Sequence, residues 1–191
     1  MNKIEFSTDN VPELSNFYFC VPLCYRGNEY QTSEHLYQAM KFAYFDDGTN
    51  HAYADFVAEI RAQKTPYKAK TLASCRQGGR YAWQRELGER AKTFINRGVK
   101  FDKRWVDVRV KVMEDVLRLK FWSDKACRVV LMSTGTSELI ERTDTDAFWG
   151  DGADRKGANT LGKLLMKIRD EWAQNGVPEK MPPFHTFSNK I

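Results

Sequence analysis

The sequence predicts a mostly helical α+β protein that forms a single domain, with a small β-hairpin or short sheet near its N-terminus. A chain of 191 residues is long enough for one sizeable core and too short for two comfortable domains. A hydrophobic content of 42%, with 12 Phe, 8 Tyr and 5 Trp, favours a compact core over disorder. Apolar residues recur at helical spacing along most of the chain. We expect the domain to span 1–176 and the Pro-rich tail 177–191 to be irregular.

The β-component is expected mainly at the N-terminus. Residues 3–31 carry short apolar runs interrupted by Pro12 and Pro22, a pattern that is typical of two or three short strands. The turn Arg26-Gly27-Asn28-Glu29 predicts a hairpin among them. A further strand is expected at Glu138-Leu139-Ile140-Glu141-Arg142-Thr143.

Helical periodicity covers most of the remaining chain. The first helix is expected to begin at Thr32 or Ser33, because a hydroxyl at this position accepts a hydrogen bond from the first helical N–H groups. The expected helices run from there to about Tyr44, over 51–62, from Pro66 to Gly78-Gly79, over 81–97, 102–121 and 123–132, and from Asn159 to about Trp172.

The helix over 102–121 has the strongest pattern, and an arginine interrupts its apolar stripe. Arg109 falls in the stripe, where a guanidinium cannot lose its charge and therefore requires a partner. That partner is either a carboxylate in a structural salt bridge or a bound phosphate or carboxylate. The stripe consists of Trp105, Val108, Val112, Val116 and Leu119, and the residues expected on the opposite face are Asp107, Lys111, Glu114 and Arg118.

Composition and spacing exclude several classes of site. The net charge of +5 suits an anionic ligand, and the basic stretch 76–100 is either a solvated face or a nucleic-acid contact. The four cysteines include no C-x-x-C pair, the three histidines have no H-E-x-x-H spacing, and no phosphate-loop or dinucleotide fingerprint occurs. We therefore expect no metal and no cofactor. With no apolar span or signal segment, a cytoplasmic location with free thiols is expected.

The first helix carries a polar edge that combines an acid, an amide and an amine. At about 100° per residue, Glu34, Gln38 and Lys41 fall within an arc of roughly 60°. The edge is either a solvated, hydrogen-bonded row or a catalytic arrangement in which a carboxylate and an amine act together.

The loop 144–154 has two aromatic residues, two glycines and four aspartates, and it leads through Gly157 and Asn159 into the last helix. Glycines beside a helix N-terminus allow backbone N–H groups to approach an anion closely. The loop is therefore either an anion-binding element or a Gly-rich surface turn, and it lacks the glutamate that an EF-hand requires.

These fragments, taken in order, resemble the YbiA-like family, also called NADAR. Each fragment alone is weak, but their order over roughly 14–169 is specific. They comprise Leu14-Ser15-Asn16-Phe17, Tyr30-Gln31-Thr32-Ser33-Glu34-His35, Gln38-Ala39-Met40-Lys41-Phe42, Pro66 with Ala69-Lys70, Trp105 with Arg109 and Met113, Lys120-Phe121, Leu131 with Thr134-Gly135, Leu139 with Glu141, Phe148-Trp149-Gly150-Asp151-Gly152, Gly157 with Asn159, Leu161-Gly162, Leu165-Met166, and Ile168-Arg169.

The resemblance implies a helical YbiA-like domain with N-glycosidase activity, which hydrolyses the C–N bond between a base or aminopyrimidine and C1′ of a ribose. The implied substrates are phosphorylated riboflavin-pathway intermediates or ADP-ribosyl groups on guanine, possibly within a nucleic acid. We expect Glu34 and Lys41 to be catalytic, with phosphate held by Arg109 and by the N-terminus of the last helix. The residues expected to bind substrate are Asn16, Gln38, Trp105, Arg109, Trp149, Gly150, Asp151, Gly152 and Asn159.

Two other classes of function remain open. A non-catalytic sensor of ADP-ribose or a nucleotide would keep Arg109 and the Gly-rich loop without the chemistry. A nucleic-acid-binding module would use the basic stretch 76–100. Retention of both Glu34 and Lys41 favours the catalytic function over either.

Overall fold

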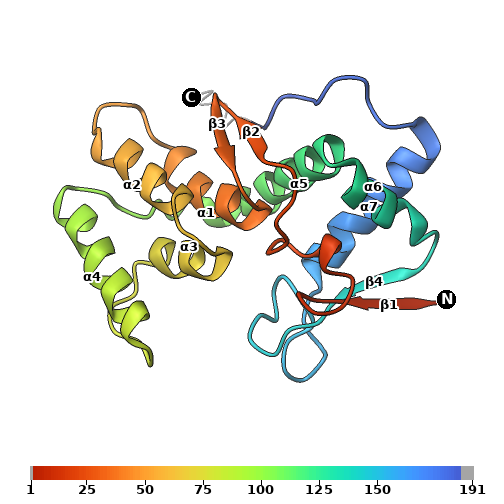
Figure 1. The fold of residues 1–191 in the computed structure, drawn as a ribbon, viewed down its shortest axis with the longest axis horizontal. Helices are drawn as coiled ribbons and strands as arrows, with labels where there is room; N and C mark the ends of the chain where they lie inside the picture. The colour runs from red at the N-terminus through yellow and green to blue at the C-terminus, as the bar shows by residue number, and fades with distance from the viewer. Residues whose placement is uncertain (1, 186–191) are drawn as a thin grey trace.

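A computed structural model describes residues 2–185, and seven α-helices and four short strands lie within that range (Figure 1). The mostly helical α+β prediction is confirmed. The strands are β1 (Lys3–Phe6), β2 (Leu23–Tyr25), β3 (Asn28–Tyr30) and β4 (Glu138–Glu141), and a single 3-10 turn, η1, covers Pro12–Leu14. The helices are α1 (Ser33–Ala43), α2 (Ala52–Arg61), α3 (Pro66–Ala73), α4 (Ala82–Asn96), α5 (Trp105–Ser123), α6 (Lys125–Ser133) and α7 (Thr160–Asn175).

The strands form two separate sheets of two strands each. β2 and β3 make the predicted antiparallel hairpin, and its turn residues Arg26 and Gly27 have φ values of 48° and 75°. Positive φ at both central residues gives the turn the right twist for a two-residue hairpin. β1 pairs in parallel with β4, with Ile4 opposite Leu139. The sequence pattern did not predict this pairing, because the two strands lie far apart along the chain.

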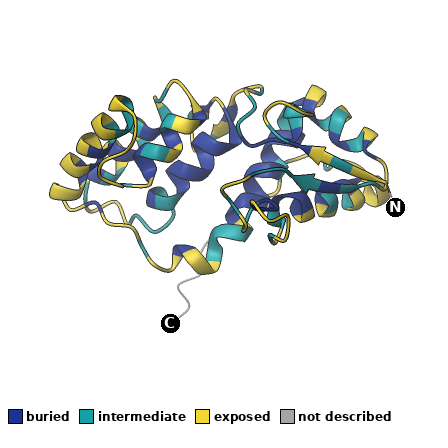
Figure 2. Cartoon of the chain, turned by 90° about the horizontal axis from the view of Figure 1, so that it is seen from below, coloured by how far each residue is buried: buried dark blue, intermediate teal, exposed yellow. Residues whose placement is uncertain are grey.

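Helix α1 lies in the middle of the molecule, packed against α2, α3 and α5. Figure 1 shows α2, α3 and α4 on one side of α1, and the β1–β4 sheet with α6 and α7 on the other. Buried residues are concentrated along the central helices, whereas the outer faces are exposed (Figure 2). Helix α1 therefore lies between the two halves of the fold.

Helix α5 differs from its predicted pattern on one face. Glu114 was expected toward solvent, but it is buried at 5% exposure. Its carboxylate accepts hydrogen bonds from Arg118, in the same helix, and from Lys167 of α7, whose Nζ lies 2.8 Å from both oxygens. These two cations compensate for the lost hydration of the carboxylate. Helical spacing alone could not reveal that α7 covers this face.

Several predicted boundaries also shift. Helix α3 ends at Ala73, before the predicted Gly78-Gly79, and Cys75 then takes a left-handed φ of 53°. Strand β4 ends at Glu141 rather than Thr143, and α7 continues to Asn175. The tail 177–185 contains no helix or strand, and its last predicted residues, 186–191, lie outside the described residues.

All four cysteines are free, and no cluster of potential metal ligands occurs among the described residues. None of the helices in the described part of the chain has the length and apolar character needed to cross a membrane.

Helix α7 lies so close to β4 that it requires a glycine at the contact. A Cβ added at Gly162 would stand 2.2 Å from the carbonyl oxygen of Leu139 and 2.6 Å from Oδ1 of Asn159. Asn159 joins the same two elements, since its Nδ2 donates to the Leu139 carbonyl at 2.8 Å and its Oδ1 accepts from the Glu141 N–H at 3.0 Å. The position of β4 is therefore fixed by the start of α7.

We expect Gly162→Ala to lower the free energy of unfolding by about 1–3 kcal/mol. Alanine favours a helix over glycine by about 1 kcal/mol, but the collision with the β4 backbone opposes and exceeds that gain. Urea unfolding followed by circular dichroism measures the change. Gln174→Ala, on an exposed position of the same helix, is the control for propensity alone. Equal or greater stability of Gly162→Ala would contradict the close contact.

Candidate active site

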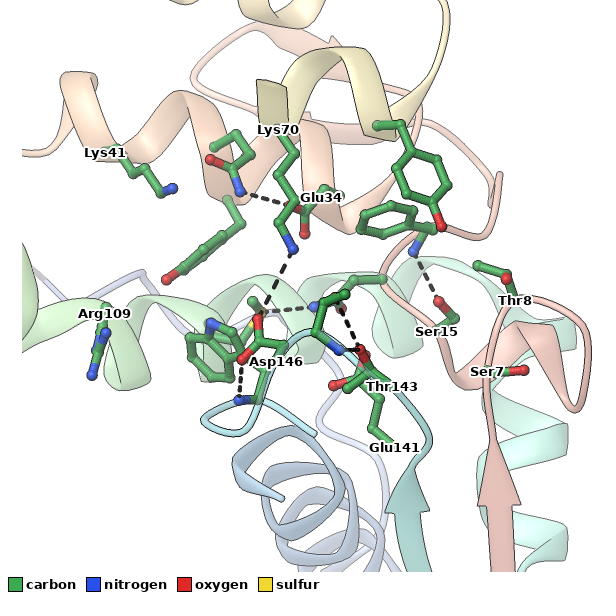
Figure 3. A pocket seen from close by; sticks show the side chains of 18 of the residues that line it. Ser7, Thr8, Ser15, Glu34, Lys41, Lys70, Arg109, Glu141, Thr143 and Asp146 are labelled. Carbon is green, nitrogen blue, oxygen red and sulfur yellow. Dashed lines mark hydrogen bonds and ion pairs between the residues drawn. The ribbon is translucent and has the colours of Figure 1, made fainter. Parts of the chain in front are cut away.

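A cavity of about 520 Å³ lies between α1, α3, α5 and the segment that follows β4 (Figure 3). The polar edge of α1 faces this cavity, and Glu34, Gln38 and Lys41 all line it. The edge is therefore not a solvated surface row. Asn16 and Trp149, from two loops, and Trp105 and Arg109, from α5, line it as well. Seven of the side chains expected from the sequence thus meet in one place.

Local hydrogen bonds fix the start of α1. The Thr32 hydroxyl accepts from the backbone N–H of His35 at 3.2 Å, as predicted for the helix cap. The ring of His35 is held on both sides, because Nε2 donates to the Gln63 carbonyl at 2.9 Å and Nδ1 accepts from Thr32 at 2.8 Å. The Glu34 N–H donates to the Asn16 carbonyl at 3.0 Å, which ties the Asn16 loop to the helix. Glu34 and Asn16 are therefore presented to the cavity by rigid backbone.

Glu34 is buried at 5% exposure and is hydrogen-bonded to Gln38, whose Nε2 donates to Oε1 at 2.6 Å. Burial raises the pKa of Glu34 above its usual value, although the charges of Lys70 and Lys41 and the Gln38 hydrogen bond oppose this effect. A carboxyl with a raised pKa in a cavity is suited to proton transfer near neutral pH.

Lys41 lies further along the same helix edge, with its Nζ 5.7 Å from the centre of the Tyr37 ring. Burial lowers its pKa below that of an ordinary lysine, and the Glu34 charge only partly opposes this. No carboxylate within residues 2–185 is at ion-pair distance from the amine. The Glu34 charge therefore acts on Lys41 through space, without a salt bridge between them. A larger fraction of Lys41 is therefore neutral, and a neutral amine is a nucleophile.

Lys70 and Asp146 cross the centre of the cavity, and sequence analysis did not assign either to the site. Lys70 comes from α3, and its Nζ lies 3.9 Å from Oδ2 of Asp146 (Figure 3). Oδ1 of Asp146 accepts the backbone N–H groups of Phe148 and Trp149, at 3.1 and 2.9 Å, and so orients both aromatic residues. Lys70 belongs to one of the fragments that resemble the family and Asp146 to the Gly-rich loop, but no sequence spacing predicts that α3 lies near this loop.

Glu141 is the second carboxyl of the cavity that the sequence analysis did not assign. It stands at the end of β4, and its Oε2 is buried without a hydrogen-bond partner. Burial, with the negative charges of Asp146 and Glu34 added, raises the pKa of Glu141 to about 8. Glu141 belongs to one of the fragments that resemble the family, but the pattern of its strand does not indicate that the side chain enters a cavity.

Arg109 is not paired with a carboxylate within the described residues. Its guanidinium stacks on the ring of Phe148, 3.7 Å from the ring centre, and its buried Nε lacks a hydrogen-bond partner. It makes no structural salt bridge there. A cation on the cavity wall with unused donors retains the capacity to bind an anion.

Three aromatic rings line the cavity beside Arg109. The Tyr37 ring contacts Trp105 and Trp149, with centre distances of 5.3 and 5.6 Å. The cavity can therefore hold a planar ring against an aromatic surface while an anionic group lies near the cation.

The Gly-rich loop does not line the cavity at four of its expected binding positions: Gly150, Asp151, Gly152 and Asn159. Asp151 is buried and pairs with Arg142 and Arg155, and it accepts the Thr143 N–H at 3.1 Å. A Cβ at Gly150 would stand 2.7 Å from the Glu141 carbonyl oxygen. These residues support the cavity wall from behind.

The N-terminus of α7 is also not open to a phosphate, contrary to the expectation. The N–H groups of Thr160 and Leu161 donate to the carbonyls of Phe148 and Trp149, at 3.2 and 2.9 Å. The chain's own loop occupies the donors that a phosphate would need. These hydrogen bonds hold the Phe148-Trp149 segment against the helix.

Four of the cavity's side chains keep buried polar atoms without hydrogen-bond partners. They are Oδ1 of Asn16, Oε1 of Gln38, Nε of Arg109 and Oε2 of Glu141. Leaving such atoms unpaired costs about 1–3 kcal/mol each, and a polar ligand would satisfy them. The cavity is therefore built for a ligand rich in hydrogen-bonding groups.

The chain is similar to several known proteins over most of its length. The NADAR domain model matches residues 3–173. The chain is 34% identical over 167 residues to N-glycosidase YbiA of Shigella flexneri, which covers 87% of this chain and 85% of that protein. It is 34% identical over 140 residues to an N-glycosidase of Nostoc punctiforme, covering 73% and 72%.

Two further similarities concern a longer protein and a solved structure. A riboflavin biosynthesis protein of Vibrio vulnificus is 34% identical over 173 residues, which are 90% of this chain and 38% of that one. The NMR structure of Escherichia coli YbiA has a TM-score of 0.64 at 29% identity, covering 94% of this chain and 91% of that one.

Proposed function

Since the chain belongs to the NADAR family and is an N-glycosidase like its curated relatives, we propose that its substrate is a phosphorylated ribosyl compound. In this proposal the enzyme acts in the cytoplasm and hydrolyses the C–N bond between C1′ of the ribose and a base or aminopyrimidine. The substrate is of the ADP-ribosyl-guanine or riboflavin-intermediate type. The observation that carries the proposal is the meeting of a buried carboxyl, Glu34, and an amine whose pKa burial lowers, Lys41, in a cavity with unpaired polar atoms.

The substrate is bound by a charge interaction with its phosphate and by stacking of an aromatic side chain on its base. Arg109 binds the phosphate, because its guanidinium is fixed on the Phe148 ring and its Nε is unpaired. Trp105 or Trp149 stacks on the base, and both lie beside the Tyr37 ring. Asn16 and Gln38 present amide oxygens to donor groups of the sugar or the base.

The chemistry follows one of two routes. In the covalent route, the neutral Lys41 amine attacks C1′ of the ring-opened sugar, the base leaves with a proton on its nitrogen, and water hydrolyses the Schiff base. In the direct route, water attacks an oxocarbenium-like C1′ and Lys41 only orients Glu34 or the substrate. Glu34 transfers protons in both routes.

The test is incubation with a panel of ribosylated bases, with products detected by mass spectrometry. The panel includes ADP-ribosyl-guanosine, the same group within an oligonucleotide, and ribosylaminopyrimidine phosphates. We expect release of the free base from at least one of them, and Arg109→Met should raise the KM for that substrate. Tight binding of ADP-ribose without turnover of any member would favour a sensor instead. Salt-sensitive binding to unmodified nucleic acid without turnover would favour a nucleic-acid module.

A further inference from the structure

We infer that Glu141 is a second catalytic carboxyl, which holds the proton that passes to the leaving nitrogen. The inference rests on the proposed N-glycosidase reaction and divides its proton transfers between two residues. Figure 3 shows Glu34 and Glu141 on different walls of the cavity, with the Lys70–Asp146 pair between those walls. Glu34 belongs to α1 and Glu141 to β4, so each carboxyl is supported by a separate element.

The backbone of Glu141 is held on both sides. Its N–H donates to Oδ1 of Asn159 at 3.0 Å, and its carbonyl accepts the N–H of Asp151 at 3.0 Å. The parallel partner across the sheet is Phe6. A carboxyl on such a rigid support can keep a constant position relative to a bound substrate, which proton transfer requires.

The carboxyl itself has no partner within the described residues. Oε2 is buried without a hydrogen bond, and the neighbouring Arg142 turns its guanidinium to Glu5 and Asp151 instead. A buried charge without a partner is costly, so a carboxyl in this position is stabilised in its neutral form.

The charges around Glu141 come from every side of the cavity. Glu34 of α1 and both Asp146 and Asp151 of the following loop are negative, and Lys70 of α3 is the one opposing cation among its main electrostatic neighbours. Phe6 of β1 and Asn159 before α7, which contact its backbone, do not titrate. Burial and this negative surround raise the pKa to about 8, so Glu141 carries a proton at neutral pH.

Glu34 has more cationic surroundings than Glu141, although burial and the Asp146 charge still raise its pKa. Lys70, Lys41 and the Gln38 amide all favour its carboxylate, in opposition to burial. Two carboxyls in different electrostatic surroundings can act as an acid and a base in the same reaction. Glu141 is then the acid, and Glu34 is the base that accepts a proton from the Lys41 amine or from water.

The C1′–N bond breaks, its electron pair stays on the nitrogen, and that nitrogen takes the proton of Glu141. The electrons that C1′ needs come from the ring oxygen in the direct route or from the Lys41 amine in the covalent route. Water then adds to C1′, and its proton returns through Glu34 or directly to the Glu141 carboxylate. In the covalent route this addition also breaks the bond between C1′ and the Lys41 nitrogen, whose electron pair returns to the free amine.

The first test uses the protein without substrate. Infrared spectra of the full chain should show a carboxylic-acid carbonyl band at pH 7 that disappears as the pH rises through about 8. The band that titrates near pH 8 should be absent from Glu141→Gln. It should be present in Glu34→Gln, which removes the other cavity carboxyl with a raised pKa, and in Glu138→Gln, which alters a partly exposed carboxyl of the same strand, paired with Lys3. If Glu141→Gln retains the band, the inference fails whether or not any substrate is turned over.

The second test compares leaving groups. Glu141→Gln should lower kcat by about a hundredfold or more on a substrate whose nitrogen needs a proton. On a ribosylpyridinium phosphate, whose base leaves without a proton, the loss should stay below about tenfold. Glu141→Asp should recover part of the first activity, which separates proton transfer from a folding defect. Equal losses on both substrates, or wild-type rates on both, would overturn the assignment. Failure of the wild type on every substrate would instead reject the proposed function.

Discussion

Glu34→Gln is expected to lower kcat for the ribosylated substrate by more than about a hundredfold, with a much smaller change in KM. Glutamine keeps the shape of the side chain and can still hydrogen-bond Gln38, whose amide now lies 2.6 Å from the carboxylate. It cannot accept and release a proton. The loss should therefore fall on the chemical step rather than on binding.

The rate of the wild-type enzyme should depend on pH through Glu34. The carboxylate is the active form of Glu34, so the wild-type rate should fall as the pH drops through its pKa, which burial raises above the usual value. In Glu34→Gln the negative charge that raises the pKa of Lys41 is gone. The pKa of Lys41 should therefore fall, and the pH below which the remaining activity of Glu34→Gln declines should be lower than in the wild type.

Stability separates a catalytic role of Glu34 from a structural one. A buried ionised group costs desolvation energy, so Glu34→Gln should unfold at the same temperature as the wild type or a higher one. Glu89→Gln, at an exposed position on α4, is the matched control and should change neither rate nor stability. Near-normal turnover in Glu34→Gln would remove Glu34 from the mechanism.

Local sequence patterns predicted those parts of the site that lie on one element. Glu34, Gln38 and Lys41 share an edge of α1 because helical geometry places them there, and the Thr32 cap fixes where that helix begins. Arg109 stood out because it interrupts an apolar stripe. These arguments depend only on neighbouring residues, and they needed no knowledge of the tertiary fold.

The rest of the site depends on contacts between distant segments. Lys70 and Asp146 meet across the cavity, and Glu141 reaches it because β4 pairs with β1. Periodicity says which face of an element is buried but not which element covers it. Sequence analysis therefore noted these residues without assigning them to the site.

The Gly-rich loop shows a different limit. Glycines before a helix indicate close backbone approach, and both an anion site and a tight loop need it. Here the approaching group is the chain itself, since the carbonyls of Phe148 and Trp149 take the first N–H groups of α7. Only the tertiary structure distinguishes these two uses of the same glycines.

Lys41→Met should abolish turnover to below about a thousandth of the wild-type rate if the amine forms the Schiff base. Burial lowers the pKa of Lys41, and no carboxylate in the described part of the chain is within ion-pair distance to hold its proton. Turnover that depends on the neutral Lys41 amine should therefore be measurable below the pH at which an ordinary lysine loses its proton.

Borohydride added during turnover should reduce the intermediate to a stable secondary amine, found by mass spectrometry on the peptide that contains Lys41. Lys70→Met is the matched control, because Lys70 is an amine of the same cavity that is paired with Asp146 at 3.9 Å. The adduct should persist in Lys70→Met and vanish in Lys41→Met. Turnover without an adduct on Lys41 would exclude the covalent route and leave direct attack by water. In that direct route, Lys41→Arg should keep a substantial share of the activity, because arginine retains the positive charge.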